Sequence, residues 1–480
     1  MPKIEKKHER PESSRTHVIV GDGITALAFL QEFQGDAGDH VIVIGTRASQ
    51  LGRGDAYARG QEDTPWRFAY LLNSPADDID PRFAAWLADR WSQVAETMAG
   101  RAPDWLSAAE PLVAAGDIYG VNAPREFYGD FMEEQATAAI TALEARGITI
   151  TRVDDTVLSL ELHQDGVTVC TASGDRISAR GVDVATGGPS TMRIEGDNGA
   201  FSAPSVFGHE HRIAEHIKSG AEIFCIGGNA AMLDVLRLCQ SLVPESALRF
   251  KACAPDGEVP APLIPRLPRK LTQPRLTQGH RTAASLLAEI QGEIDRAQAN
   301  GDEMREIRAG FRAFFLENPL SLFLSDVEQA RKVPGQLRFW LRGGTRDTIL
   351  DMHRLIKENR VQIVKGLVLE VISHDTGAEV VVKDDGGSTR RLSTGFVINC
   401  AGAGPNSTYD PMTTDLLTKG LLEHSAGPSG LKVGQGCQLG TTAVRYLSPA
   451  VSEIGDEVVA MPLYDAHMLR SYVARARQSV

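Results

Sequence analysis

The residues best suited to chemistry form a glycine-rich turn near the start of the chain. An apolar run at residues 18–20 ends in the pattern G-x-G-x-x-A, and an apolar-rich stretch follows at 27–33. This order predicts a strand, a tight turn and a helix, in which Gly21 permits the turn and Gly23 lets the backbone approach a pyrophosphate. The helix N-terminus then offers free N–H groups to phosphate oxygens, and Thr25 lies in its first turn. The alternative is a tight turn that binds nothing.

A second stretch repeats this strand, turn and helix order with one change. Residues 221–226 precede Gly227 and Gly228, and Asn229 stands where the G-x-G pattern has its second glycine. Because asparagine tolerates positive φ better than other non-glycine residues, the turn can persist. Its side chain makes a close approach of a pyrophosphate harder. Nucleotide binding and a structural remnant therefore both stay open for this turn.

The second strand of the first unit departs from the usual dinucleotide-binding pattern. Residues 41–44 are apolar, and the chain continues as Gly45, Thr46 and Arg47. Most dinucleotide folds place an acidic residue here, which accepts a hydrogen bond from the adenosine ribose. Either Thr46 or Arg47 takes over this role, or the nucleotide is held less tightly, or it is absent.

Length, charge and cysteine spacing limit the class of protein. The 480 residues predict two or three domains. A net charge of −12 argues against binding nucleic acid nonspecifically and against anchoring to an acidic membrane, and no apolar run is long enough to span a bilayer. Residues 1–16 are polar and predict a disordered leader rather than a secretion signal. Six scattered cysteines without a C-x-x-C pair fit a reducing cytoplasm and argue against a disulfide reductase.

The remaining chain alternates between strand-like and helix-like stretches. Helices are predicted over 124–146, in two or three segments over 282–332, and over 347–359. Residues 148–185 alternate in the manner of a small meander, whose last strand ends in A-T-G and commonly returns to the first nucleotide unit. Residues 396–405 resemble that A-T-G segment.

Several motifs occur together in an order that resembles the bacterial FAD-NAD(P)-binding family, which is distantly related to the flavin-dependent amine N-hydroxylases. The resemblance covers about residues 17–425. It is carried, in chain order, by Gly21 to Ala26, Gly52-Arg53-Gly54-x-Ala56-Tyr57, Leu71-Leu72-Asn73-x-Pro75-Ala76, Arg125-x-x-Tyr128-Gly129-Asp130, Gly227 to Asp234, Asp351-x-His353-Arg354 and Asn399-Cys400-Ala401-Gly402.

The resemblance implies an α/β fold with two Rossmann-like dinucleotide-binding domains, the second inserted in the first, and a helical insert. It implies an FAD-binding domain over 17–205 and 346–480, and an NAD(P)-binding-like domain over 206–345 that contains a Pro-rich loop. It implies that FAD and NAD(P)H are the cofactors. The residues it implies are Gly21, Gly23 and Thr25 at the FAD pyrophosphate, Arg53 and Asn73 near the flavin, and Gly227, Gly228 and Asn229 at the nicotinamide nucleotide.

These features predict an NAD(P)H-dependent flavin monooxygenase that oxidises a small amine or amino-acid-like metabolite, with no protein acid or base required. Three departures favour alternatives: the missing acid near Gly45, the altered turn at Asn229, and the absence of a Gly-Asp turn in residues 458–464 around Met461. The alternatives are an oxidase or dehydrogenase that uses FAD alone, and a flavoprotein-derived scaffold that binds a metabolite or a partner without redox turnover.

Two groups of charged or ligating residues have simpler interpretations. His209-Glu210-His211 is a possible metal pair without an evident third ligand, and we predict a solvated loop and no metal there. The basic residues Arg266, Arg269 and Lys270 of the Pro-rich loop are predicted to be solvated, although a position near a 2′-phosphate would favour NADPH.

Overall fold

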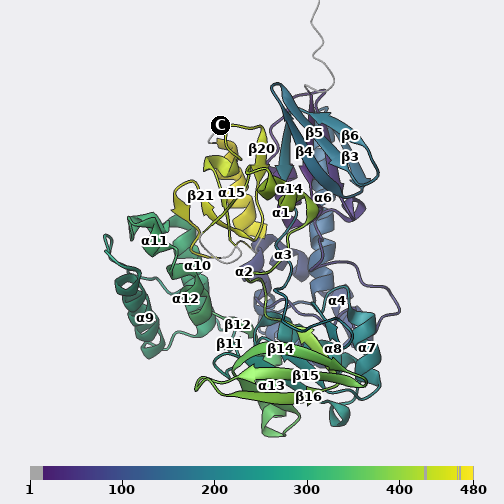
Figure 1. Cartoon of the computed structure of the whole chain (residues 1–480), viewed down its shortest axis with the longest axis vertical. Coiled ribbons are helices and arrows are strands. Elements are labelled where there is room, and N and C mark those ends of the chain that lie inside the picture. Colours follow the sequence, from purple (N-terminus) through teal and green to yellow (C-terminus); the bar gives the residue numbers. More distant parts are fainter. Residues whose placement is uncertain (1–14, 426–429, 462, 464–465, 479–480) are drawn as a thin grey trace, which may run out of the picture.

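Two parallel sheets organise the chain in the computed structural model, which describes residues 15–425, 430–461, 463 and 466–478. Figure 1 shows the unit built on the first sheet at the top, the unit built on the second at the bottom, and a group of helices to one side. Parallel sheets of this kind are covered on both faces, so most of their strands are largely apolar and buried. The predicted α/β class is therefore confirmed.

The first sheet has the strand order β20-β7-β1-β2-β3, and all neighbouring strands are parallel. Its strands are β1 (Thr16–Val20), β2 (His40–Gly45), β3 (Thr149–Asp154), β7 (Gly181–Val184) and β20 (Val444–Tyr446). All five residues of β1 are buried. Because β7 pairs directly with β1, the prediction that the A-T-G segment returns to the first unit is confirmed.

Helices of the first unit begin with α1 (Ile24–Gln31), which follows β1 and contacts both α6 (Arg125–Ala145) and α15 (Ala466–Gln478). The long helix predicted over 124–146 is confirmed as α6. The segments between β2 and α6 are η2 (Ala48–Gln50), α2 (Ala76–Ile79), α3 (Pro81–Asp89), α4 (Trp91–Arg101), α5 (Pro103–Ala114) and η3 (Ile118–Gly120).

An antiparallel meander separates β3 from β7. Its strands are β4 (Val157–His163), β5 (Gly166–Thr171) and β6 (Arg176–Ala179). Helix α14 (Pro411–Thr418) packs on it, and Asp415 accepts a hydrogen bond from the backbone N–H of Leu160 at 3.2 Å. The predicted meander over 148–185 is thus right only for these three strands, because β3 and β7 belong to the parallel sheet.

The second sheet repeats this construction, with the strand order β13-β10-β9-β17-β8 and parallel neighbours throughout. Its strands are β8 (Ser202–Ala203), β9 (Ile223–Ile226), β10 (Phe250–Ala254), β13 (Val361–Lys365) and β17 (Phe396–Asn399). Alternate residues of β9 face two different cores. Ile223 and Cys225 pack against helices, whereas Phe224 and Ile226 pack against a second meander.

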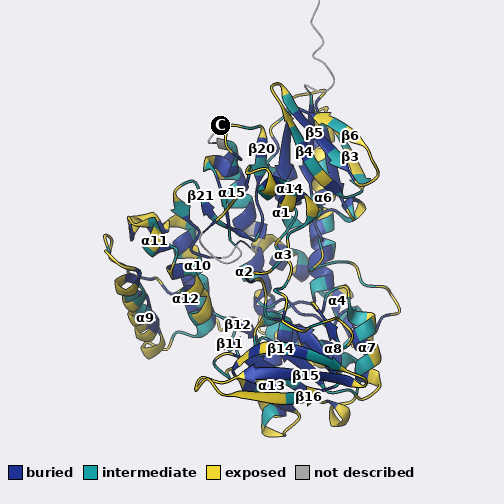
Figure 2. Ribbon diagram, viewed as in Figure 1, coloured by how far each residue is buried: buried dark blue, intermediate teal, exposed yellow. Residues whose placement is uncertain are grey.

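This second meander lies between β13 and β17, as the first lies between β3 and β7. Its strands are β14 (Leu367–His374), β15 (Gly377–Lys383) and β16 (Thr389–Thr394), and Figure 2 shows the buried residues of β15 at its centre. The helical segments of this unit are α7 (Glu210–Lys218), α8 (Ala230–Leu242), η4 (Glu245–Ala247) and α13 (Arg346–Lys357). The helix predicted over 347–359 is confirmed as α13.

The predicted division of the chain is wrong in one respect. Residues 346–480 were expected in the first unit, yet β13 and β17 pair with β10 and β9 of the second sheet. Strand β8, expected before the boundary at residue 205, pairs with β17 as well. An apolar strand pattern predicts a buried strand but does not specify the sheet that it joins.

A helical insert leaves the second unit after β10. It comprises β11 (Ala261–Leu263), α9 (Ala283–Ala299), α10 (Met304–Glu317), η5 (Leu320–Leu322), α11 (Val327–Ala330), α12 (Val333–Trp340) and β12 (Gly343–Thr345). The helices predicted over 282–332 are confirmed, and Figure 1 shows α9–α12 projecting to the left. The insert reaches the C-terminal part of the first unit, where Arg331 donates to Glu453 at 2.7 Å.

The C-terminal segments complete the first unit. They are β18 (Glu423–His424), β19 (Leu431–Val433), η6 (Gln435–Cys437), β21 (Val451–Ile454) and β22 (Glu457–Val458), followed by α15. Asp183 of β7 is fully buried and contacts His17 at 2.7 Å and Arg477 of α15. Burial alone would raise the pKa of Asp183, but its contacts with His17, Arg477 and Arg445 outweigh burial and hold the pKa at about 2. This ionised contact fixes α15 to the sheet beside α1.

Three sequence predictions concern the ends of the chain and its relation to membranes. The predicted leader falls largely on residues 1–14, which lie outside the described residues, and Thr16 already begins β1. In the C-terminal stretch 458–464, residues 462 and 464 also lie outside them, whereas Met461 is buried. Within the part of the chain that the structure describes, none of the helices has the length and apolar character needed to cross a bilayer.

Candidate dinucleotide-binding site

Gly21 connects β1 to α1 in a conformation that only glycine adopts readily. Its φ is +118°, and its N–H donates to the carbonyl oxygen of Ile44 on β2 at 2.7 Å. A Cβ atom here would overlap the carbonyl group of Ala185, which follows β7. Gly21 therefore allows three neighbouring strands of the first sheet to meet at their carboxyl ends, where open α/β sheets bind ligands.

Gly23 has a different physical role from Gly21. It precedes α1 with an ordinary φ of −88°, and a Cβ atom here would have only the Cα of Gly54, at 3.6 Å, within 4 Å. The backbones of the two glycines thus lie close together at the N-terminus of α1, and no side chain would lie within 4 Å of a Cβ atom at residue 23. No side chain caps this helix, and Thr25 is buried in its first turn. The free backbone N–H groups, with no side chain over Gly23, fit a pyrophosphate.

The glycine-rich loop that follows β2 packs against this turn. The N–H of Gly52 donates to the carbonyl oxygen of Asp22 at 2.8 Å, and Gly52 has a φ of +102°. The loop then brings Tyr57 next to Tyr128 of α6, with ring centroids 4.8 Å apart. Burial raises the pKa of Tyr57, so its phenol stays neutral at physiological pH.

The sequence analysis missed Asp22, which lies between the two glycines of the turn. Its Oδ2 accepts hydrogen bonds from the backbone N–H of Arg47 at 2.7 Å and from the hydroxyl of Thr46 at 3.4 Å. The Arg47 guanidinium pairs with Asp55. The two residues predicted to replace the missing acid are therefore donors to an acid that the turn itself supplies. An acidic residue inside the turn was the available signal.

The side chain of Arg53, predicted to lie near the flavin, is hydrogen-bonded to other groups of the protein. Arg53 is 2% exposed, and its guanidinium donates to Glu133 at 2.7 Å, to Asp130 and to the Tyr57 carbonyl oxygen at 3.1 Å. Its nitrogens are thus occupied by α6 and by its own loop. The backbone N–H of Arg53 donates to the Gln50 carbonyl oxygen at 3.2 Å, and the side chain fastens the glycine-rich loop to α6 instead of facing a ligand.

Asn73 lies in a segment that joins the two units. The carbonyl oxygen of Leu72 accepts hydrogen bonds from Asn122 at 2.9 Å and from Thr345 of β12 at 3.1 Å. The half-buried side chain of Asn73 makes no hydrogen bond with another described residue. The segment therefore holds Asn73 in place and leaves its amide available to a ligand.

An ion pair crosses from the first unit to the second beside this segment. Arg125, at the start of α6, donates to Asp234 of α8 at 2.7 Å and to the carbonyl oxygen of Leu71 at 3.2 Å. Asp234 is 3% exposed, and burial raises its pKa to about 6, although Arg125 opposes the shift. The pair fixes α8 relative to α6, so the two glycine turns keep a defined relation.

The wild-type protein is expected to lose stability as the pH rises from about 4 to about 6, and Asp234→Asn is expected to remove this pH dependence. An unfolded aspartate has a pKa of about 3.9, so the folded state binds more protons in this window and its free energy of unfolding falls as pH rises. We expect the variant to flatten that fall by on the order of 2 kcal/mol. Urea unfolding across the window measures it. Asp385→Asn, which changes an exposed ion pair with Lys365, should leave the pH dependence as in the wild type, and a wild-type dependence in Asp234→Asn would contradict the assignment.

The second turn reproduces the geometry of the first. Gly227 has a φ of +105°, its N–H donates to Cys253 at 2.8 Å, and a Cβ atom would overlap the carbonyl group of Cys400 after β17. Asn229 is exposed and precedes α8 with an extended φ of −122°, so the expectation that it relies on tolerance of positive φ is wrong. The extended backbone at residue 229 accepts asparagine without strain. Gly228, in contrast, has no room for a side chain, because a Cβ atom there would overlap Ala254.

The basic residues of the Pro-rich loop are paired with carboxylates. Arg266 pairs with Glu306, Lys270 pairs with Asp302, and Arg269 contacts Asp77 and Asp117. Their partners lie mainly on α10 and its flanks and on α2. Arg269 thus ties the insert to the first unit, whereas Arg266 and Lys270 pair within the insert, so these cations give no support for NADPH over NADH.

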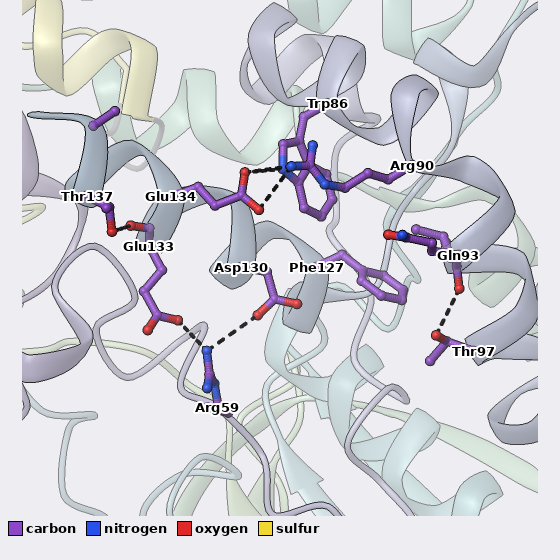
Figure 3. Close-up of a pocket in the computed structure, with 12 residues that line it drawn as sticks. Arg59, Trp86, Arg90, Gln93, Thr97, Phe127, Asp130, Glu133, Glu134 and Thr137 are labelled. Carbon is purple, nitrogen blue, oxygen red and sulfur yellow. Dashed lines mark hydrogen bonds and ion pairs between the residues drawn. The ribbon is translucent and has the colours of Figure 1, made fainter.

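A cavity of about 690 Å³ lies between α6 and the helices α3 and α4 (Figure 3). Glu134 accepts hydrogen bonds from the indole of Trp86 at 2.8 Å and from Arg90 at 3.0 Å, and Arg59 donates to Glu133 at 2.7 Å. The cavity contains none of the predicted site residues, and its charges are paired with one another.

The predicted H-x-H pair does not gather further ligands. His211 packs edge-on against Trp66, with ring centroids 5.0 Å apart. Among the described residues, no group of three or more histidine, cysteine, aspartate or glutamate side chains is arranged to hold a metal ion. The six cysteines are free.

Comparisons with known proteins agree with this geometry. Residues 18–189 match the model of a family described as FAD-NAD(P)-binding, so this part of the chain is an FAD-NAD(P)-binding domain. No curated protein matched the chain's sequence. The matched range includes the first turn, the glycine-rich loop, Asn73 and the return strand β7.

Solved structures with the same fold include flavin-dependent hydroxylases. The cadaverine monooxygenase of Erwinia amylovora, bound to FAD, has a TM-score of 0.56 at 11% identity, covering 97% of this chain and 94% of that one. The ornithine N-hydroxylase of Kutzneria sp. 744, with reduced FAD, NADP⁺ and L-ornithine, has a TM-score of 0.51 at 13% identity, covering 97% and 98%. The ornithine hydroxylase of Pseudomonas aeruginosa has a TM-score of 0.51 at 14% identity, covering 97% of both. The chain therefore has their two-unit fold.

Proposed function

We propose that this chain, whose residues 18–189 form an FAD-NAD(P)-binding domain, is an NAD(P)H-dependent flavin monooxygenase acting on a small amine or amino-acid-like metabolite. One observation carries the proposal. Both parallel sheets present the same turn, with a glycine at positive φ packed on the carbonyl group that follows the return strand. Two matched turns at the carboxyl ends of two sheets support two dinucleotides in one protein.

The chain's own residues act by binding and orienting. The first turn and the uncapped N-terminus of α1 would hold the FAD pyrophosphate, with Gly54 beside Gly23 at this turn. The second turn would hold the nicotinamide nucleotide at the N-terminus of α8. The chemistry that bound FAD would supply is acceptance of a hydride from NAD(P)H and transfer of electrons to O₂. The Arg125–Asp234 pair, which joins α6 to α8, would keep the two binding turns in a fixed position relative to each other.

The substrate class rests on the solved structures of the same fold, which are named for ornithine and cadaverine. In the proposed reaction, an amine, O₂, NAD(P)H and a proton give a hydroxylamine, water and NAD(P)⁺. A nitrogen–oxygen bond forms, the O–O bond breaks, and NAD(P)H is the reductant. In this reaction the chain would bind and orient the cofactors and the amine rather than supply an acid or a base.

The experiment is oxygen consumption by the FAD-loaded protein with NADPH or NADH and a panel of amines that includes ornithine, lysine and cadaverine. We expect at least one amine to raise oxygen consumption and to gain one oxygen atom by mass spectrometry. The Gly23→Val variant is the matched control, because it is expected to lack FAD. If all amines leave the background unchanged and gain no oxygen, amine oxidation is contradicted.

The same preparation separates the alternatives. Reduction of the flavin by a substrate, but not by NADPH or NADH, would identify an oxidase or dehydrogenase that uses FAD alone. Absence of bound flavin together with failure to take up added FAD would identify a scaffold without redox turnover.

A further inference from the structure

We propose that Asp22 replaces the acidic residue that dinucleotide folds carry at the end of their second strand, and that it accepts a hydrogen bond from the adenosine ribose of FAD. The inference rests on the proposed use of FAD. It assigns the ribose contact to the turn itself rather than to Thr46 or Arg47, and so removes the first of the three departures from the family pattern.

The position of the carboxylate supports this assignment. Strands β1 and β2 are parallel neighbours in which Val20 pairs with Ile44, so the residues after both strands meet at one edge of the sheet. Asp22 Oδ2 is fixed over the end of β2 by the Arg47 N–H at 2.7 Å. Asp22 Oδ1 makes no hydrogen bond with any described residue, and Asp22 is only half-buried, which leaves this oxygen available as an acceptor at the turn.

Gly45 shows that the carboxylate and a side chain at the end of β2 exclude one another. A Cβ atom at residue 45 would lie 2.8 Å from both the Cβ and the Oδ2 of Asp22. A glutamate at residue 45, the usual arrangement, would therefore collide with the aspartate at 22. This chain has the acid at residue 22 and a glycine at residue 45. The acid has therefore moved from the end of β2 to the turn, and it has not been lost.

The neighbouring residues are poor substitutes for this acceptor. Arg47 has donors only, and its guanidinium already pairs with Asp55. The Thr46 hydroxyl donates to Asp22. Asp154, at the end of the next strand, accepts from the N–H of Ser49 at 2.9 Å. Its other oxygen also makes no hydrogen bond with a described residue, but Asp154 ends β3, whereas Asp22 lies in the turn between β1 and α1 itself.

The test is an exchange of the two residues, read as the dissociation constant of FAD for the apoprotein by flavin fluorescence. Asp22→Gly and Gly45→Glu are each expected to weaken FAD binding about tenfold or more, the first by losing the acceptor and the second by collision. The double variant Asp22→Gly/Gly45→Glu should recover most of the affinity. Asp22→Asn keeps an oxygen for the Arg47 N–H but offers the ribose an amide donor. This variant should therefore fold normally but bind FAD more weakly than the wild type does.

A second readout identifies the ribose directly. Competition by ADP and by 2′,3′-dideoxy-ADP should differ about tenfold in the wild type and become equal in Asp22→Gly. If Asp22→Gly binds FAD as the wild type does, or keeps the preference for ADP, or if the double variant recovers nothing, the assignment is overturned. If the wild-type apoprotein binds no FAD at all, the proposed function fails instead, so the two failures are distinguishable.

Discussion

Gly23→Val is expected to abolish FAD binding while leaving the protein folded. Residue 23 has an ordinary φ of −88°, and a Cβ atom would have only the Cα of Gly54 within 4 Å, so the fold has room for a side chain. The added methyl groups would instead fill the space beside the α1 N-terminus. We expect the dissociation constant of FAD to rise at least about 100-fold. Fluorescence titration of the apoprotein measures it, with thermal unfolding as the test of folding.

Two variants control this prediction. Gly21→Val places a side chain at a φ of +118° against the Ala185 carbonyl group, so it should destabilise the protein by about 4 kcal/mol or prevent folding. Gly292→Val on α9 meets nothing within 4 Å and should change neither property. A Gly23→Val protein that folds and binds FAD as tightly as the wild type would show that the pyrophosphate does not lie at this turn.

Arg53→Met is expected to lower the free energy of unfolding by about 3–5 kcal/mol, because it removes the buried cation that carboxylates of α6 share and leaves them only the more exposed Arg59 and Arg67. Arg53 is 2% exposed and ties its loop to Glu133 and Asp130. Burial already raises the pKa of Asp130 and of Glu126, which lies 4.0 Å from the guanidinium. Without Arg53 these groups should take up protons more readily, so the loss of stability should be smaller near pH 4 than near pH 7. Urea unfolding at both pH values measures it.

Arg59→Met is the matched control for Arg53→Met. Arg59 donates to the same Glu133 at 2.7 Å, as Figure 3 shows, but its side chain is 50% exposed. Exposed pairs contribute about 0–1 kcal/mol. Equal effects of the two substitutions would contradict the view that burial of Arg53, rather than its ion pairs alone, fixes the glycine-rich loop to α6.

Local patterns in the sequence predicted the parts of the fold that local physics determines. Both turns and helix α6 follow from apolar runs and glycine positions that are close together in the chain. The division into units could not be predicted in the same way. Strands β13 and β17 have the same apolar character as β1, and only their partners β10 and β9 assign them to the second sheet.

The candidate site was predicted where it depends on the backbone and missed where it depends on contacts between distant residues. The roles of Gly21 and Gly227 follow from the turn pattern. The contact between Asp22 and Arg47 requires that two strand ends meet, and the burial of Arg53 requires that α6 packs on its loop. Neither can be read from spacing. For one of the three departures, the missing acid near Gly45, the structure therefore offers a specific replacement, Asp22.

The central claim is that this chain binds FAD in the first unit and has it reduced by a nicotinamide nucleotide bound in the second. The most direct measurement is the absorption spectrum of the purified protein, reconstituted with FAD if needed, before and after anaerobic addition of NADPH or NADH. We predict flavin bands that are lost on addition of at least one of the two nucleotides. A protein that remains colourless and takes up no FAD would contradict the claim, and bound flavin that neither nucleotide reduces would contradict its second half.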